Sequence, residues 1–376
     1  MRGGADWFSA LQRIRITPEN PPADYDVVIE PGVLDTIGAV VRDVAAPHTC
    51  VIISDDRVGA LYGDRVAANI RGAGIESTLL TFPAGEANKT LATWQSLTER
   101  MLQHGVGRDC CVVALGGGVA GDVAGFVAAA YMRGLPFVQV PTSVVAMIDS
   151  SIGGKTGVDT QYGKNLVGAF HQPRVVLVDP TVLLTLPENE LRGGMAEALK
   201  HGAIANADYL RWLSESVGAI ERGSMPEVTR MIRGSVEIKA DFVARDVHEA
   251  GPRAALNFGH TIGHAIERVS EYTVSHGEAV AIGMCLEARC GEIAGVTAPG
   301  TEAELRRIVA AYGLPTDVPA GMSADAVVES TRSDKKARRG RSRYTLISRL
   351  GATACSDDGA WTHELNDDLV RGAIAE

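Results

Sequence analysis

The chain has 376 residues, of which 45% are hydrophobic and 22% charged, a composition typical of a globular protein long enough for two domains. Its formal net charge of −10 argues against general nucleic-acid binding, and no apolar run is long enough for a signal peptide or a membrane span. The six cysteines have no metal-type spacing, so the sequence predicts a protein of the reducing cytoplasm.

Apolar, β-rich runs alternate with helix-like segments in the first half of the chain. Strands are expected at 26–29, 49–54, 77–82, 110–115, 136–140 and 174–178, with helices at 34–45, 57–72 and 90–105 between them. Alternation of this kind predicts an α/β fold with a mostly parallel sheet covered by helices on both faces.

Two strand ends in this half are candidates for binding a nucleotide. Gly116, Gly118 and Gly121 formally satisfy G-x-G-x-x-G, which lets backbone N–H groups meet a pyrophosphate at a helix N-terminus. The ordinary fingerprint also needs an acidic residue about twenty positions on, and the sequence there, GLPFVQVPTS, has none. A dinucleotide held in some other way remains open. Asp55, which ends the second strand, is a candidate for either a ribose ligand or a helix N-cap.

A second glycine-rich turn lies in SSIGGKTG (150–157). Gly154-Lys155-Thr156 looks like the end of a P-loop, but that motif needs a glycine where Asp149 stands, which argues against an ATPase of this kind. The turn instead presents Lys155, and Lys164 and Asn165 follow shortly after. Lysines projected from such a backbone suit a small anionic substrate.

The second half of the chain is expected to be helical. Residues 188–313 read almost wholly as helices, with caps at Asn189 or Asn206 and breaks at Gly202, Gly223 and Gly251. Strand–helix alternation gives way to helices at Leu186-Pro187. We therefore expect one domain to cover 1–185 and the other 186–376.

Histidines gather in the segment RAALNFGHTIGHAIERVSEYTVSH (253–276). His260 and His264 stand four apart, so one helical face can present both, and His276 follows after a break. Neutral imidazole is the commonest protein ligand for zinc-like ions, and Glu197 in GMAEALKHG could complete a set with an open position for substrate. The sequence therefore predicts a catalytic metal site.

Four motifs occur together in the order typical of one family. These are GGGVAGDVAGFVAAAYMRG, PTSVVAMIDSSIGGKTGVDTQYGKNLVGAFHQP, GMAEALKHG and LNFGHTIGHAIE followed by SHGEAV. Over roughly residues 25–350 the chain resembles the 3-dehydroquinate synthase family of sugar-phosphate cyclases. The resemblance implies an N-terminal Rossmann-like, NAD-binding α/β domain, a C-terminal all-helical domain that binds metal and substrate, and an active site between them.

The resemblance also implies the reaction. The family converts 3-deoxy-arabino-heptulosonate 7-phosphate to 3-dehydroquinate and phosphate, a step of the shikimate pathway. NAD is reduced and reoxidised within the cycle, phosphate is eliminated, and ring opening with an intramolecular aldol step closes the carbocycle. One divalent metal ion, zinc or cobalt, is needed to polarise the oxygen that is oxidised.

Roles for individual residues follow from the resemblance. It assigns the metal to Glu197, His260 and His276. It moves His264 to the substrate phosphate, together with Lys155, Asn165 and either Lys336, which we favour, or its neighbour Lys335. Arg133 would reach the same phosphate from the partner subunit of a homodimer. It assigns the substrate carboxylate to Arg253 and Lys239, and the substrate hydroxyls to Asp149, Lys200 and Asn257. It assigns NAD to Asp55, Glu86, Lys89, Gly117, Gly118, Asp122, Thr142, Ser143, Lys155 and Lys164.

Three positions depart from the commonest pattern of the family, and three other functions remain as alternatives. Ser143 lies where the family usually has threonine, Asp159 lies where it often has asparagine, and Pro252 immediately precedes Arg253. An aminodehydroquinate synthase or another sugar-phosphate cyclase would share most of these motifs. A metal-dependent polyol or alcohol dehydrogenase of the glycerol-dehydrogenase type would share the fold, but it has no need of Lys155 or Arg253. A cyclase that has lost its activity would be expected to lack some of the proposed site residues, which are all present.

Overall fold

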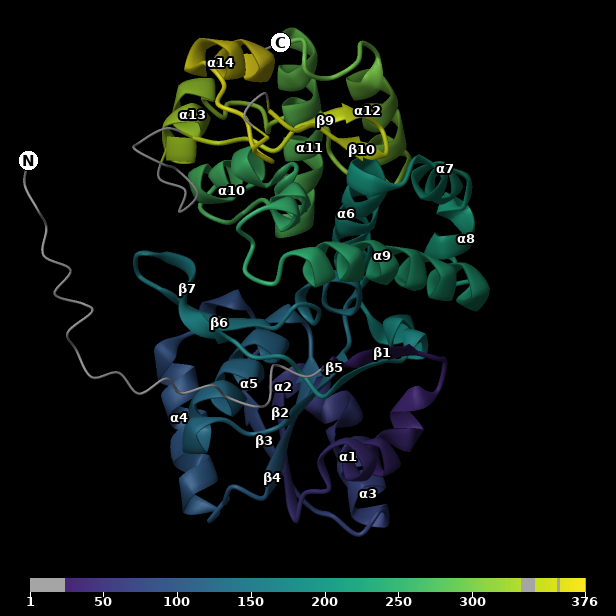
Figure 1. Ribbon diagram of the computed structural model, residues 1–376, viewed down its shortest axis with the longest axis vertical. Coiled ribbons are helices and arrows are strands. Elements are labelled where there is room, and N and C mark those ends of the chain that lie inside the picture. Colours follow the sequence, from purple (N-terminus) through teal and green to yellow (C-terminus); the bar gives the residue numbers. More distant parts are fainter. Residues whose placement is uncertain (1–23, 333–341, 357–358, 376) are drawn as a thin grey trace, which may run out of the picture.

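A parallel sheet and a helical half lie one above the other along the long axis of the molecule (Figure 1). The computed structural model describes residues 24–332, 342–356 and 359–375. The first half of the chain forms the sheet with its covering helices, and the second half is predominantly helical. The predicted α/β fold with a Rossmann-like first half is therefore confirmed. Within the described residues no helix combines the length and apolar character needed to cross a membrane.

All six strands expected from the sequence belong to this sheet. They are β1 (Asp26–Ile29), β2 (Thr49–Asp55), β3 (Glu76–Phe82), β4 (Cys110–Gly116), β5 (Phe137–Pro141) and β8 (Val175–Val178). Their spatial order is β1-β8-β5-β4-β2-β3, and every neighbouring pair is parallel. The central strands β4, β5 and β8 are buried along their whole length, as expected when helices cover both faces.

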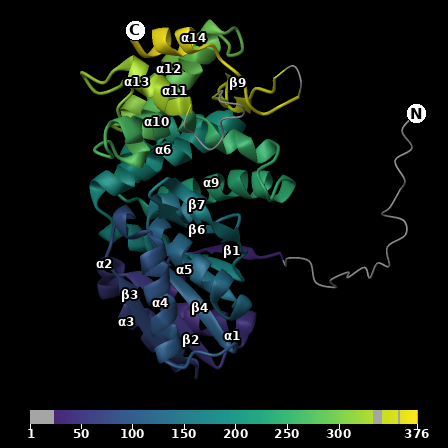
Figure 2. The same ribbon diagram turned by 90° about the vertical axis from the view of Figure 1, so that its left-hand side faces the viewer.

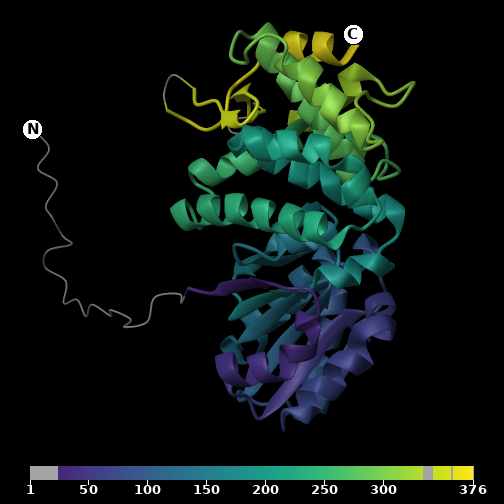
Figure 3. The same ribbon diagram turned by 90° about the vertical axis from the view of Figure 1, so that its right-hand side faces the viewer.

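Side chains of the sheet alternate between two apolar layers because successive residues of a strand point to opposite faces. In β2, Ile52 packs with the layer that includes α1 (Ile37–Ala45) and α3 (Asp64–Gly72). Val51 and Ile53 pack with α4 (Leu91–Gln103) and α5 (Gly118–Ala130) on the other face. Figure 2 is seen from the side of α4 and α5, and Figure 3 shows α1 and α3 from the opposite side.

The strand order creates a switch point at the carboxyl ends of β2 and β4. The chain passes from β2 to β3 on one side, whereas β4 lies on the other side of β2. Open α/β sheets bind ligands at such a point, outside the carboxyl ends of the strands. Asp55 ends β2, and the glycine-rich loop after β4 leads into α5. Both candidates for nucleotide binding therefore lie at this one crevice.

An antiparallel hairpin, which was not predicted, lies outside the main sheet. It consists of β6 (Lys155–Thr160) and β7 (Gly163–Phe170), and it packs on α5. Gly153 and Gly154 have positive φ values of 95° and 67° and turn the chain into β6, whose first residue is Lys155. The same glycines hid the hairpin in the sequence, because they are typical of a loop.

Short helical turns join the elements of the first half. They are the 3₁₀ helices η1 (Val33–Thr36), η3 (Glu86–Asn88), η4 (Tyr131–Arg133) and η6 (Pro180–Thr185), the short α2 (Asp56–Val58), and the π-helical η2 (Gly59–Gly63) and η5 (Ala146–Ser150). The turn η5 follows β5 and packs on α9 of the helical half.

The second half contains nine α-helices among the described residues. They are α6 (Glu188–Ala205), α7 (Ala207–Glu215), α8 (Val217–Glu221), α9 (Met225–Arg245), α10 (His260–Val269), α11 (His276–Ile293), α12 (Thr301–Ala311), α13 (Ala324–Arg332) and α14 (Asp367–Ala375). The 3₁₀ helix η7 (Pro252–Asn257) precedes α10, and a small sheet of β9 (Ile347–Arg349) and β10 (Ala352–Thr353) adds a non-helical element that was not predicted.

Of the predicted helix signals, the break at Gly202 is wrong, the cap predicted at Asn189 or Asn206 is found at Asn206, and the breaks at Gly223 and Gly251 are right. Asn189 lies inside α6 rather than at its cap, and Gly202 also lies within α6, where a Cβ would stand 2.9 Å from Leu210 Cβ. Gly202 therefore serves close packing against α7 instead of ending a helix. Asn206 caps α7 by accepting a hydrogen bond from Tyr209 N at 3.0 Å, and Gly223 and Gly251 lie at breaks.

The predicted boundary at 185–186 falls between η6 and α6. One hydrophobic cluster continues across this point, from the strand residues Val176 and Val178 to Val236 and Phe242 of α9. In Figure 3, α9 lies across the top of the sheet half. The exact division into two domains stays a prediction.

Glycines bring the backbones of α6, α10 and α11 into direct contact. A Cβ on Gly277 of α11 would stand 2.2 Å from the carbonyl oxygen of Gly193 in α6, and one on Gly283 would stand 2.0 Å from that of Gly259, the N-cap of α10. A real Cβ cannot approach so closely, and here the obstacle is backbone that cannot turn away. The three helix ends therefore meet only because these positions lack side chains.

Replacing Gly277 by alanine should destabilise the protein by about 1–3 kcal/mol or more, because the added methyl group overlaps the backbone of α6. The shift of the urea unfolding midpoint measures this cost. Gly372→Ala is the matched control, since Gly372 lies within α14 and a Cβ there has no atom within 4 Å. The control should be neutral or stabilising by up to about 1 kcal/mol. Equal midpoints for the two variants would contradict the packing argument.

Candidate metal centre and anion-binding cluster

One carboxylate and two imidazoles converge where α6, α10 and α11 meet. Glu197 lies in the middle of α6, and His260 and His276 are the first residues of α10 and α11. One ligand atom from each of the three residues lies within 4.8 Å of the others. This set has the donor types and the spacing that suit zinc or cobalt, with a position left open for substrate.

Glu197 is the centre of this cluster. Its side chain is only 1% exposed, its Oε1 lies 3.4 Å from Nε2 of both His260 and His276, and its Oε2 forms an ion pair with Lys200. Burial alone would raise the pKa of Glu197, but Lys200 and the two histidines hold it well below its usual value. The carboxylate is therefore ionised and available as a ligand.

The second ring nitrogen of each histidine has its own acceptor. His260 Nδ1 donates to the carbonyl oxygen of Phe258 at 3.2 Å, and His276 Nδ1 donates to Glu267 Oε2 at 3.4 Å. These contacts fix the ring orientation in which Nε2 is directed toward Glu197. In metal-binding histidines, the nitrogen that does not bind the metal usually has a hydrogen-bond acceptor of this kind. The residues present therefore fit a divalent metal ion.

The two imidazoles differ in charge. Burial and the nearby Lys200 lower the pKa of His260 to about 3, so this ring is neutral. Burial also disfavours the charged form of His276, but hydrogen bonds to Glu197 and Glu267 outweigh it and raise its pKa to about 10. A cation bound at the cluster would replace the proton on His276 Nε2.

A buried carboxylate from α11 positions His260. Glu287 is fully buried, and its two oxygens accept hydrogen bonds from Gly259 N at 2.7 Å and Ile262 N at 3.1 Å. Gly259 has φ 80° and no side chain of its own to cap α10, so Glu287 takes the place of an N-cap. The first residue of α10 is held at the cluster by this contact.

Two other groups of three residues have metal-like spacing, but cations compete for their carboxylates. His264, Glu267 and His276 form one group, in which Glu267 Oε1 already binds Lys164 Nζ at 3.0 Å. Asp149, Glu197 and His201 form the other, in which Asp149 is paired with Lys239. The rings of His264 and His260 nevertheless lie close, with centroids 5.3 Å apart.

Cationic side chains surround the metal cluster on the side of η5. Lys239 of α9 and Lys200 of α6 are buried, and Lys239 forms an ion pair with Asp149 of η5. Burial and its cationic neighbours lower the pKa of Lys239, although Asp149 opposes the change. Burial acts the same way on Lys200, but attraction to Glu197 and Asp149 outweighs it and raises the pKa.

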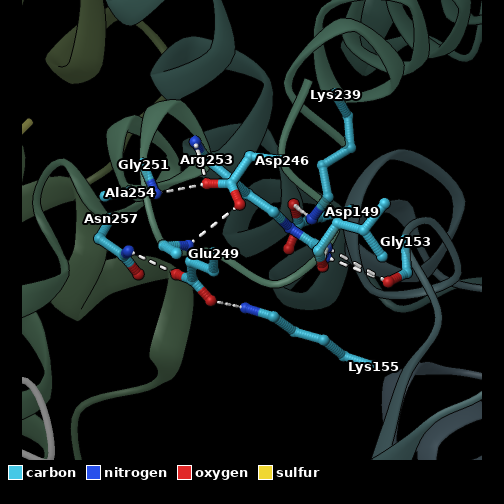
Figure 4. Close-up of polar contacts among 12 residues, drawn as sticks. Asp149, Gly153, Lys155, Lys239, Asp246, Glu249, Gly251, Arg253, Ala254 and Asn257 are labelled. Carbon is cyan, nitrogen blue, oxygen red and sulfur yellow. Dashed lines mark hydrogen bonds and ion pairs between the residues drawn. The ribbon is translucent and has the colours of Figure 1, made fainter. Parts of the chain in front are cut away.

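Arg253 is the largest charged side chain in the interior. It is 1% exposed, and its guanidinium donates to the carbonyl oxygens of Gly153, at 3.3 Å, and Val247, at 2.7 Å. Its Nε is buried without a hydrogen-bond partner among the described residues. A Cβ on Gly153 would stand 2.3 Å from the guanidinium, so the glycine turn before β6 makes room for it. Figure 4 shows Arg253 directed toward Gly153.

Glu249 lies between two of the predicted substrate residues. Its carboxylate forms an ion pair with Lys155 and accepts a hydrogen bond from Asn257 Nδ2 at 2.7 Å (Figure 4). Glu249 has φ 57°, and the loop around it is tied by Asp246, which accepts hydrogen bonds from the backbone of Ala250 and Gly251. An internal carboxylate thus contacts one cation, Lys155, and one neutral donor, Asn257, that a substrate anion would need.

The loop after β4 has the shape of a phosphate cradle. Gly116 has φ 152°, and a Cβ there would lie 2.6 Å from Ala120 Cβ and 3.2 Å from Asp55 Oδ2. A Cβ on Gly118 would lie 3.1 Å from Ser150 Oγ. The N-cap of α5, Gly117, makes no side-chain hydrogen bond, so no side chain caps the backbone N–H groups of the first turn, which are the donors that a pyrophosphate needs.

The other predicted cofactor residues line the same region. Asp55 Oδ1 accepts hydrogen bonds from Arg57 N and Val58 N, so Asp55 is a helix N-cap, and its Oδ2 faces Gly116. Thr142 N donates to the carbonyl oxygen of Gly116 at 2.9 Å, and Ser143 Oγ accepts from Ala146 N at 3.3 Å. The first bond holds the chain after β5 against the glycine loop, and the second is a local bond at the start of η5.

Lys89 organises a second, buried group beside α5. Its Nζ lies 2.5 Å from Asp122 Oδ2 and 2.6 Å from Asn165 Oδ1. Asn165 was expected near Lys155 at the substrate phosphate. The hairpin register pairs Lys155 with Phe170 instead, five residues along β7 from Asn165. The structure therefore brings the Asn165 side chain to the cofactor residues rather than to Lys155.

The roles of two further residues, Arg133 and Lys336, stay predictions. Arg133 is exposed at the end of η4, where it has φ 67°. Lys336, together with Lys335, lies outside the described residues.

Sequence reasoning missed the carboxylates that hold the site together, namely Asp246, Glu249, Glu267 and Glu287. A signal existed for two of them. Glu267 is seven residues after His260 and three after His264, on the same helical face, and Glu287 interrupts the apolar run AVAIGMCLEARC. Glu249 lies in a loop without periodicity, so no local pattern marks it.

Comparison with known families gives two matches that adjoin each other. The family model described as 3-dehydroquinate synthase N-terminal matches residues 79–193, and the family model described as 3-dehydroquinate synthase C-terminal matches residues 194–337.

Individual proteins agree with these matches. The chain is 45% identical over 351 residues to a 3-dehydroquinate synthase of Xanthomonas campestris pv. campestris, covering 91% of this chain and 94% of the relative. A structure of 2-deoxy-scyllo-inosose synthase complexed with carbaglucose-6-phosphate, NAD+ and Co2+ is similar with a TM-score of 0.85 at 26% identity, covering 93% of this chain and 95% of that one. The 2-epi-5-epi-valiolone synthase of Streptomyces hygroscopicus, with NAD+ and Zn2+ bound, has a TM-score of 0.84 at 27% identity, covering 97% and 98%.

Removing one imidazole should weaken metal binding strongly. For His276→Ala we expect zinc affinity to fall by at least about 100-fold. Loss of a residue that only hydrogen-bonds to a metal ligand already lowers metal affinity by roughly 10–100-fold, and His276 is a proposed ligand itself. Competition with a chromophoric chelator measures the affinity, and circular dichroism checks that the variant is folded. His48→Ala, at an exposed position far from the cluster in sequence, is the control and should bind zinc as the unmodified protein does. Unchanged affinity in His276→Ala would refute the assignment.

Proposed function

The chain belongs to the 3-dehydroquinate synthase family, and from that premise we propose that it converts 3-deoxy-arabino-heptulosonate 7-phosphate to 3-dehydroquinate and phosphate. The observation that carries the proposal is the group of cations beside the metal cluster. Lys155, Lys239 and Arg253 interact electrostatically with one another or with the same carboxylates, Asp149 and Glu249. A substrate that bears both a phosphate and a carboxylate needs such a group.

Glu197, His260 and His276 would hold the divalent ion, zinc or cobalt. When bound, the ion supplies positive charge to the substrate oxygen that is oxidised and later reduced. Lys200 remains paired with Glu197, so it keeps this ligand ionised and can donate a hydrogen bond to a neighbouring hydroxyl of the substrate.

The crevice at the switch point of the sheet would hold NAD. When bound, NAD supplies reversible hydride transfer, which leaves no net redox change over the cycle. The glycine loop with Gly117 and Gly118 would receive the pyrophosphate. The remaining residues proposed for this site are Asp55, Glu86, Lys89, Asp122, Thr142, Ser143, Lys155 and Lys164.

The cations have two tasks in this scheme. Arg253 and Lys239 would hold the substrate carboxylate and so fix the ring relative to Glu197. Lys155, His264 and Lys336, together with Arg133 of the partner subunit, would hold the phosphate and stabilise its charge as it leaves. Asn165 would join them only after leaving Lys89. Asp149 and Asn257 would orient hydroxyls. An anion that binds to Lys155 and Asn257 must displace the carboxylate of Glu249 from them. Substrate binding is therefore linked to a change in the loop around Glu249.

Substrate choice within the family rests on the carboxylate. A cyclase that acts on a sugar phosphate without a carboxylate has no need of the Arg253 and Lys239 pair. An aminodehydroquinate synthase would use the same groups and is the second candidate. We further propose a cytoplasmic homodimer. Five of the six cysteines are buried and all six are free, which supports a reducing compartment.

Activity should appear as metal-dependent phosphate release. With 3-deoxy-arabino-heptulosonate 7-phosphate we expect release of phosphate that EDTA abolishes and zinc or cobalt restores, without accumulation of NADH, because the hydride returns within each cycle. Phosphate detection and absorbance at the NADH band, followed together, measure both.

Glucose 6-phosphate serves as the control substrate, since it lacks the carboxylate. No release from the first substrate, with metal and NAD shown to be bound, would overturn the proposal, and release from its amino analogue would then identify the second candidate. Net NADH from simple alcohols would indicate a dehydrogenase.

Arg133 should act across the dimer. Arg133→Ala and Lys155→Ala are each expected to be inactive, and mixing them with subunit exchange should restore about a quarter of full activity, because half the dimers are mixed and each has one intact site. Activity of the mixture, with exchange verified by mass spectrometry of differently tagged subunits, tests this. Recovery of no activity would contradict a shared site.

A further inference from the structure

Glu267 of α10 lies between the metal cluster and the cofactor residues. Its side chain is buried, and its two oxygens face in different directions. Oε2 accepts a hydrogen bond from His276 Nδ1 at 3.4 Å, and Oε1 accepts one from Lys164 Nζ at 3.0 Å. His276 belongs to the helical half and Lys164 to the hairpin strand β7 of the sheet half.

The contact of Oε2 sets the orientation of one proposed metal ligand. Because Nδ1 of His276 donates to Glu267, the ring is oriented with Nε2 toward Glu197, where its distance from Oε1 is 3.4 Å. Without a carboxylate at 267 the ring could turn or change tautomer, and the ligand would no longer be directed at the cluster.

The contact of Oε1 sets the position of a proposed cofactor residue. Lys164 Nζ also lies 3.9 Å from Glu86 Oε1 and 4.7 Å from the centroid of the Tyr272 ring. The ammonium is thus shared by a carboxylate of each half, and Glu267 is the closer one. Loss of that charge would leave Lys164 with the more distant Glu86 and release it from its present place.

We propose that Glu267 is a positioning residue that couples the divalent metal site to the NAD site, so that occupation of either one strengthens binding at the other. The inference rests on the proposed function, because it uses the metal and NAD sites named there. His276 would hold the metal ion when it is bound, its Nδ1 contacts the carboxylate of Glu267, and that carboxylate holds Lys164 near the proposed cofactor residues. By thermodynamic linkage the effect must be equal in both directions.

Binding measurements on the full chain test the coupling independently of activity. Calorimetric titration gives the dissociation constant of NAD for the metal-free and the zinc-loaded protein, and the ratio of the two is the coupling factor. We expect a factor of about 5 or more for the unmodified protein. In Glu267→Gln, which keeps the shape but not the charge, zinc affinity should fall by about 10–100-fold and the factor should approach 1.

Lys164→Met separates the two contacts. It should reduce the coupling factor to about 1 while leaving zinc affinity in the absence of NAD near that of the unmodified protein. Combining Lys164→Met with Glu267→Gln should cause no further loss of coupling. Glu302→Gln is the control, since Glu302 is a mostly buried ion-pair carboxylate of α12 that contacts Arg289 and Arg306 instead. It should leave both affinities and their ratio unchanged.

The outcomes separate this inference from the function on which it rests. Failure of the unmodified protein to bind zinc or NAD would overturn the proposed function. Normal binding of both without coupling, or coupling that survives in Glu267→Gln or Lys164→Met, would overturn the inference alone. If Glu267→Gln does not fold, Lys164→Met still decides, because its contact with Glu267 lies on a partly exposed hairpin.

Discussion

Backbone contact between α6, α10 and α11 is the constraint on which the rest of the site depends. Gly193 against Gly277 and Gly259 against Gly283 remove the side chains that would keep these helices apart. The helix ends that carry His260 and His276 can then reach Glu197 in the middle of α6. Three ligands that are far apart in sequence are held in place by rigid elements rather than by loops, which is what a site with fixed geometry needs.

Charge balance is the second constraint, because an unpaired charge in a protein interior is costly. Glu197 is paired with Lys200, Asp149 with Lys239, Asp122 with Lys89, and Glu249 with Lys155. The cations that suit an anionic substrate are therefore stable in the fold only with carboxylates beside them. In the function proposed above, substrate binding would be an exchange, in which a substrate anion takes over cations that the protein's own carboxylates hold.

The hairpin of β6 and β7 joins the two halves of the molecule. It brings Lys155 to Glu249 of the helical half at one end, and it brings Lys164 to Glu267 nearer the turn. The carboxylates on the helical side were not recognised from the sequence, although they decide how the lysines are directed. A site of this kind lies between the halves, so neither half contains it alone.

The sequence by itself determined the six strands of the sheet, the helical character of the second half, the glycine loop after β4, and the motifs that show the family. These features depend on local periodicity and on short motifs, which are readable along the chain. Only the tertiary structure decided the hairpin hidden by Gly153 and Gly154, the contact of Asn165 with Lys89, and the roles of Glu249, Glu267 and Glu287. The contacts of Asn165 and of the three carboxylates depend on partners from 8 to 103 positions away, as for Glu249 with Asn257 and Glu267 with Lys164. A buried carboxylate acquires its function from the groups that the fold places around it, and local sequence patterns do not specify which groups those are.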